Sequence, residues 1–134
     1  MPEPFAGEKT WRLFHTIHRC KPLANGCGYL HEIEGDSERG GVVLRLFDSA
    51  EDRWSAYAIS AQGLLQEPMH GSFRVGVGIF TGRRLFRERP VLVRHVWTRI
   101  ATSTPEWTQS FSQDGGETWE LNWTMRFVRA EWPD

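Results

Sequence analysis

The sequence lacks long apolar segments and carries little net charge. No apolar run in its 134 residues approaches the ~20 residues that a membrane-spanning helix requires. The first residues, Met1 to Pro4, lack the basic and apolar regions of a signal peptide. The formal net charge is −1 with both signs interspersed, so no extended field attracts a polyanion or an anionic surface. We therefore expect a cytoplasmic protein that binds neither nucleic acid nor a membrane.

Cysteine is scarce, and closely spaced metal-ligand motifs are missing. Cys20 and Cys27 flank a turn where facing strand ends could bring the two thiols together, but a reducing compartment favours free cysteines. His15 and His18 lie three residues apart on a predicted strand and so point to opposite faces. His15 and His31 have the parity to share a face on adjacent strands, and with Cys27 nearby a mononuclear site is conceivable. Without an HExxH or paired CxxC motif, we expect no metal.

Helical periodicity is also scarce, and this absence indicates the fold class. Short segments that alternate apolar and polar residues recur along the chain, separated by Gly, Pro, Asn and Asp. One strand is expected after the turn at Asn25 and Gly26. The others are expected at residues 10–19, 42–47, 54–60, 71–80, 84–87, 91–101, 107–112 and 118–129.

An open sheet of about eight to ten strands would leave two unpaired edges, so closure is favoured. The length suits one domain over residues 1–134. The sequence thus predicts a single all-β domain, an antiparallel up-and-down β-barrel, with a two-sheet β-sandwich as the alternative.

Aromatic residues are abundant, with seven Trp and eight Phe. Strict alternation in the last strand places five side chains on one face, and Asn122 falls on the other. On the preceding strand Gln109 shares a face with aromatic neighbours, where it either satisfies a neighbour's backbone or a buried water, or contacts a ligand. The five residues of the last strand are Trp119, Leu121, Trp123, Met125 and Phe127, and the neighbours of Gln109 are Trp107 and Phe111.

For the strand around Arg94, alternation does not decide which side chains point inward. One face offers Val93, His95 and Trp97, and the other offers Arg94. An inward Arg94 would need a partner or an anionic or carbonyl-bearing ligand, whereas an outward Arg94 would lie over Trp or Glu. The candidate ligand-binding residues are Tyr57, Arg94, Trp97, Trp107, Gln109, Trp123, His15 and His31.

Several stretches resemble the uncharacterised family DUF1579. They are residues 44–48, 54–57, 71–73, 76–78, 94–97 and, above all, 107–125 with the run Ser112-Gln113-Asp114-Gly115-Gly116-Glu117-Thr118-Trp119. The resemblance covers roughly residues 40–130 and implies a lipocalin-like (calycin) barrel without an established activity. The haem-binding nitrobindins are a neighbouring barrel group. Their N-terminal Gly and Trp pattern is missing here, so we expect no haem and no other cofactor.

Three functions remain open at this point. The barrel interior can hold a small, mostly apolar or aromatic molecule. The same pocket can serve a cyclase or isomerase, in which a His or Arg stabilises developing charge and no nucleophile motif is needed. Alternatively, aromatic side chains fill the interior and the protein is a structural homodimer.

Overall fold

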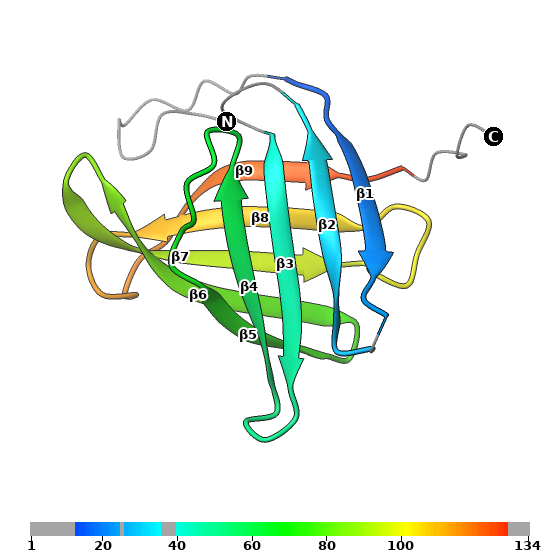
Figure 1. The fold of residues 1–134 in the computed structure, drawn as a ribbon. Coiled ribbons are helices and arrows are strands. Elements are labelled where there is room, and N and C mark those ends of the chain that lie inside the picture. The colour runs from blue at the N-terminus through cyan, green and yellow to red at the C-terminus, as the bar shows by residue number, and fades with distance from the viewer. Residues whose placement is uncertain (1–12, 25, 36–39, 129–134) are drawn as a thin grey trace. The chain divides into compact units, whose positions relative to one another are not determined.

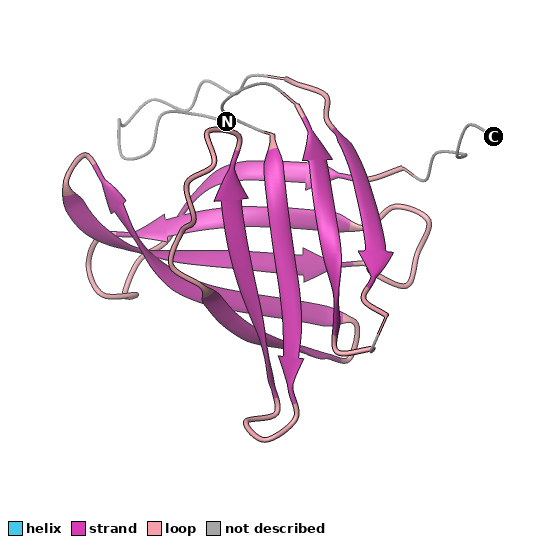
Figure 2. Ribbon diagram, in the orientation of Figure 1, coloured by secondary structure: helices cyan, strands magenta, loops and turns pink. Residues whose placement is uncertain are grey.

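The computed structural model describes residues 13–24, 26–35 and 40–128. Nine β-strands form in these ranges and no helix does, as Figure 2 shows. The strands are β1 (Ile17–Pro22), β2 (Gly28–Glu34), β3 (Gly41–Asp48), β4 (Arg53–Ser60), β5 (Met69–Arg74), β6 (Val77–Phe86), β7 (Arg89–Thr98), β8 (Glu106–Ser112) and β9 (Glu120–Arg126). No helix in the described part of the chain is long and apolar enough to cross a membrane.

The described residues divide into two compact units, Leu13–Ser72 and the chain from Phe73 onward. In the first unit the sheet order follows the sequence from β1 to β5, and in the second it follows from β6 to β9 (Figure 1). Within each unit the neighbouring strands pair antiparallel. The all-β class and the antiparallel up-and-down order predicted from the sequence are confirmed.

Side-chain alternation sorts each unit into two faces. In the first unit, His31, Arg45 and Met69 are buried on one face. In the second, Phe80 and Val93 are buried on one face together with Trp107. Large side chains therefore form the buried face of both units, and polar groups are buried among them.

The β5–β6 connection differs from the single strand expected at residues 71–80. The chain turns at Val75 and Gly76, which both have positive φ (53° and 78°). A β-branched residue rarely adopts this conformation, so no turn was expected at Val75. The hairpin brings the Phe73 ring against Gly78, where a Cβ atom would lie 2.4 Å from the ring.

The break expected between the strands at residues 71–80 and 84–87 is absent. Thr81 and Gly82 pair with Arg94 and Val93 inside the β6–β7 ladder, so β6 continues through them. The chain reverses at Arg87 and Glu88, with φ of 51° and 65°, beside the break expected between residues 87 and 91.

Candidate functional site

One face of the second unit gathers aromatic side chains around polar ones. In the strand register His95 lies opposite Gln109, Trp97 lies opposite Trp107, and Gln109 lies opposite Trp123. The structure thus brings together four of the predicted site residues on one side of the sheet. We call this surface the aromatic face, and its members are His95, Trp97, Trp107, Gln109, Trp123 and Met125.

Ring contacts tie the aromatic face together. The Trp107 side chain is 6% exposed, and its ring centroid lies 4.7 Å from that of His95 and 5.4 Å from that of Trp123. The two indoles meet edge to face at 88°, a favoured geometry for aromatic pairs. Trp97 stacks on Phe127 with centroids 5.5 Å apart. His95, Trp97 and Trp123 remain half-buried, so part of this apolar surface is uncovered.

A chain of polar side chains crosses the aromatic face. Gln109 donates from Nε2 to Asn122 Oδ1 at 2.9 Å, and its Oε1 lies 3.0 Å from His95 Nε2. Because the amide nitrogen of Gln109 faces Asn122, its oxygen accepts from His95, whose proton therefore sits on Nε2. Gln109 thus bonds two neighbouring side chains, where the sequence predicted a backbone group, a buried water or a ligand.

A β-bulge explains why Asn122 takes part. Gln109 pairs with Trp123 but the next residue, Ser110, pairs with Leu121, so Asn122 is an extra residue in β9. The bulge turns Asn122 toward Gln109 and buries it completely (0% exposed). Its Nδ2 atom has no hydrogen-bond partner among the described residues. Sequence alternation had placed Asn122 on the opposite face.

The same bulge corrects the prediction that Trp119 and Leu121 share a face with Trp123. Leu121 pairs with Ser110 and is 43% exposed. Trp119 lies under the Arg94 guanidinium, whose central carbon is 4.2 Å from the ring centroid. Arg94 alternates with His95 and so points away from the aromatic face. Two orientations of Arg94 were left open for this strand. The structure shows the outward one, in which Arg94 lies over a tryptophan ring.

A second group of polar side chains lies in the first unit, around the predicted site residue His31. His18 Nδ1 lies 2.6 Å from His31 Nε2, and Arg45 Nη1 lies 2.8 Å from His31 Nδ1. Thr16 Oγ1 lies 2.7 Å from His18 Nε2. The Arg45 guanidinium also sits 5.6 Å from the Tyr29 ring centroid. We call Thr16, His18, Tyr29, His31 and Arg45 the polar cluster.

Burial and charge set the protonation of the polar cluster. His31 is 3% exposed and Arg45 5% exposed. Burial, the Arg45 charge and His18 together lower the pKa of His31 to about 3. Burial and Arg45 lower the pKa of His18 to about 4. Both imidazoles are therefore neutral at neutral pH, beside a guanidinium.

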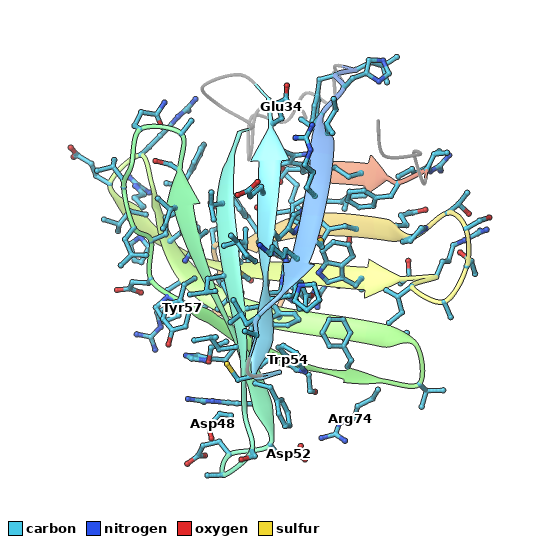
Figure 3. All side chains as sticks on the ribbon, turned by 45° about the vertical axis from the view of Figure 1, so that its right-hand side comes forward. Glu34, Asp48, Asp52, Trp54, Tyr57 and Arg74 are labelled. Atoms are coloured by element: carbon cyan, nitrogen blue, oxygen red, sulfur yellow. The ribbon has the colours of Figure 1, made fainter. Side chains whose placement is uncertain are left out.

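Two predicted site residues lie elsewhere. His15 is exposed in the extended segment before β1, and His18 rather than His15 contacts His31. Of the strand predicted at residues 10–19, residues 10–12 lie outside the described residues, and in the described part β1 begins at Ile17. The register pairs Cys20 with His31, which puts His18 on the His31 face. Tyr57 of β4 pairs with Leu44 and lies on the face opposite Arg45, while Trp54 lies on the Arg45 face (Figure 3).

The loop after β8 forms a tight turn around Asp114. Ser112 Oγ donates to Asp114 and accepts from the Gly116 N–H, and Asp114 accepts from the backbone and side chain of Thr118. These bonds, that from the Thr118 hydroxyl foremost, lower the pKa of Asp114 to about 2. Both oxygens of Asp114 accept hydrogen bonds within the turn.

The polar groups offer no cage for a metal. In residues 13–24, 26–35 and 40–128, no three His, Cys, Asp or Glu side chains are placed to hold an ion. Cys20 and Cys27 are not joined in a disulfide.

No protein-family model, curated protein or solved structure matches the chain. The resemblance to DUF1579 therefore stays a prediction.

Sequence reasoning missed most members of the polar cluster, namely Thr16, His18, Tyr29 and Arg45. On the aromatic face it missed His95 and its neighbour Asn122. Of these residues, His95 alone could have been found from the sequence, because it lies two residues from Trp97 and so shares a face with it on a strand.

Proposed function

We propose that this protein binds a small, mostly apolar ligand that carries an aromatic ring and a carbonyl group, and that it does so on the aromatic face. The observation that carries the proposal is the polar chain His95–Gln109–Asn122 set among Trp107 and Trp123. A partly uncovered apolar surface with a few convergent polar groups is typical of small-molecule sites.

The aromatic rings supply most of the binding energy in this proposal. Trp97 and Trp123 are half-buried, and Trp107 fixes the position of Trp123 through the edge-to-face contact. A ligand ring stacked on these indoles removes apolar surface from water at about 25 cal/mol per Å². Rings held by their neighbours lose little conformational freedom when they bind, which favours affinity.

The Asn122 amide determines the polar part of the ligand. Its oxygen already accepts from Gln109, so the atom left to recognise a ligand is the donor Nδ2, which is buried without a partner among the described residues. An unsatisfied buried donor costs about 1–3 kcal/mol, and a ligand carbonyl oxygen relieves that cost. A pure hydrocarbon does not. The site therefore prefers an aromatic carbonyl compound to a hydrocarbon of the same shape.

A matched pair of probes tests this preference. Intrinsic tryptophan fluorescence and thermal unfolding are followed during titration with N-methylbenzamide and with ethylbenzene. We expect both probes to bind and the amide to bind about tenfold more tightly, the value of one neutral hydrogen bond. If neither probe changes the fluorescence or the melting temperature, the proposal is wrong and a buried water satisfies Asn122.

Three variants locate the binding. Asn122→Asp keeps an oxygen for Gln109 but replaces the Nδ2 donor, and it should remove the preference for the amide. Trp123→Phe should weaken the binding of both probes. If the Asn122 variant does not fold, the Trp123 variant still tests the proposal. Trp54→Phe changes an indole that packs on Tyr29 and Phe47 in the first unit, and it should leave both affinities unchanged. Equal weakening by the Trp54 and Trp123 variants would contradict the assignment.

Native mass spectrometry of the same mixtures addresses the remaining hypotheses. Release of a chemically changed probe would favour a cyclase or isomerase on the aromatic face. A dimer that binds neither probe would favour the structural homodimer.

A further inference from the structure

The hydrogen bonds of the polar cluster run in one direction. Arginine can only donate, so Arg45 Nη1 donates to His31 Nδ1, and that nitrogen carries no proton. The neutral His31 ring therefore holds its proton on Nε2 and donates to His18 Nδ1. His18 in turn holds its proton on Nε2 and donates to the Thr16 hydroxyl. One permanently charged residue thus fixes the tautomers of two histidines.

A proton added to this chain breaks it. An imidazolium donates from both nitrogens, so a charged His31 cannot accept from Arg45. A charged His18 likewise cannot accept from His31. Either event also brings a second positive charge close to the guanidinium in a buried setting, where like charges repel strongly. A negative charge that enters with the proton would offset this repulsion.

We propose that the polar cluster binds a small oxyanion, a carboxylate or a tetrahedral anion, and takes up one proton from solvent onto the His18–His31 pair as the anion binds. The guanidinium offers the planar fork that carboxylates and phosphate-like groups prefer, and a charged imidazole adds a second donor. The site is distinct from the aromatic face, and its ligand is an anion rather than a neutral carbonyl compound.

The other groups on this face support an anionic ligand. From β1, Cys20 lies opposite His31, and burial raises the pKa of its thiol. From β2, Tyr29 faces Arg45, and burial raises the pKa of its phenol. From β4, Ala56 lies opposite Arg45 and brings no charge. Arg45 therefore carries the positive charge of the cluster at neutral pH, and an anion is the kind of ligand that this charge attracts. His18 is half-buried, which gives a route to solvent.

Histidine NMR tests the proposal directly. In the free protein at neutral pH, the ring ¹⁵N shifts of His18 and His31 should both report the Nε2–H tautomer. Titration with sodium acetate or sodium sulfate should convert one of these rings to imidazolium, and the anion that binds more tightly assigns the class. Above the pKa of about 4 of free His18, and below the pKa in the complex, the affinity should fall about tenfold per unit rise in pH.

Two variants distinguish the role of the Arg45 charge in anion binding from the role of proton uptake by the histidines. Arg45→Gln should abolish anion binding. His18→Gln can still accept from His31 and donate to Thr16 but cannot titrate, so it should bind the anion with a much weaker dependence on pH. If the Arg45 variant does not fold, the His18 variant still tests the proposal. Arg19→Gln removes an exposed charge that pairs with Glu34 on the opposite face, and it should change neither property.

Several outcomes would overturn the proposal. These are an Nδ1–H tautomer in either ring, no response of both rings to both anions, or anion binding without a change in protonation. An anion affinity lost equally in the Arg19 and Arg45 variants would indicate a general charge effect instead. Because acetate and sulfate lack an aromatic ring, these results are independent of the benzamide titration on the aromatic face.

Discussion

Acidification from about pH 7 to about pH 5 should cost the folded protein about 2 kcal/mol through His31 alone. Burial, Arg45 and His18 lower the pKa of this ring to about 3, whereas it titrates near 6.5 in an unfolded chain. Between these two values the unfolded state binds more protons than the folded state. Stability therefore rises with pH and is lost as the pH falls below about 6.5.

The magnitude follows from the same linkage. One histidine that stays neutral in the folded state removes up to about 1.4 kcal/mol of stability per unit of pH below its unfolded pKa. The descent from pH 6.5 to pH 5 therefore gives about 2 kcal/mol. His18 acts in the same direction, because burial and Arg45 lower its pKa to about 4. As a half-buried group, it should contribute less than His31.

Urea unfolding followed by tryptophan fluorescence at a series of pH values between about 5 and 7 measures this effect, in a range where most carboxylates stay ionised. His31→Gln can accept from Arg45 and donate to His18 but does not titrate, so its stability should fall less steeply on acidification. His15→Gln changes an exposed ring and should keep the parental slope. A His31 variant with an unchanged slope would refute the buried neutral histidine.

Three further substitutions test the packing and the turns, each by urea unfolding. Trp107→Ala should lower the free energy of unfolding by about 3–5 kcal/mol, because it leaves a cavity beside the His95 and Trp123 rings. A loss below about 1 kcal/mol would contradict that packing. Val75→Asn should raise stability by about 1 kcal/mol, because Val75 is fully exposed at a positive φ that asparagine tolerates; destabilisation would show that Val75 makes a contact of its own. Gly28→Ala should cost about 3 kcal/mol, because its Cβ would lie 1.9 Å from the Arg45 carbonyl oxygen; a neutral effect would contradict the close approach of β2 and β3.

Local alternation predicted much of the aromatic face. Trp107 and Gln109 share a face because their separation of two residues places both side chains on one side of any regular strand. The same reasoning failed at Asn122, where a single inserted residue shifts the phase of β9. A bulge depends on the hydrogen bonds between two strands, so a pattern read along one strand cannot reveal it.

The members of the polar cluster are set by the register between strands and not by alternation along one strand. His31 was predicted, but its partners His18 and Arg45 are 13 and 14 residues away in the sequence. The structure pairs Cys20 with His31 and Tyr29 with Arg45, and these pairings bring the three nitrogen-rich side chains together. The pairing of Cys20 with His31 decided that His18, and not His15, lies on the His31 face.

The sequence by itself determined that the chain is all-β, that its strands follow one another antiparallel, and that its tryptophans gather in the C-terminal third. These properties depend on period-two alternation and on turn residues, which act within a few positions of one another. Only the tertiary structure decided which polar groups meet across strands. Hydrogen bonds between side chains need contact within about 3 Å, and a shift of one residue in register moves a side chain to the other face.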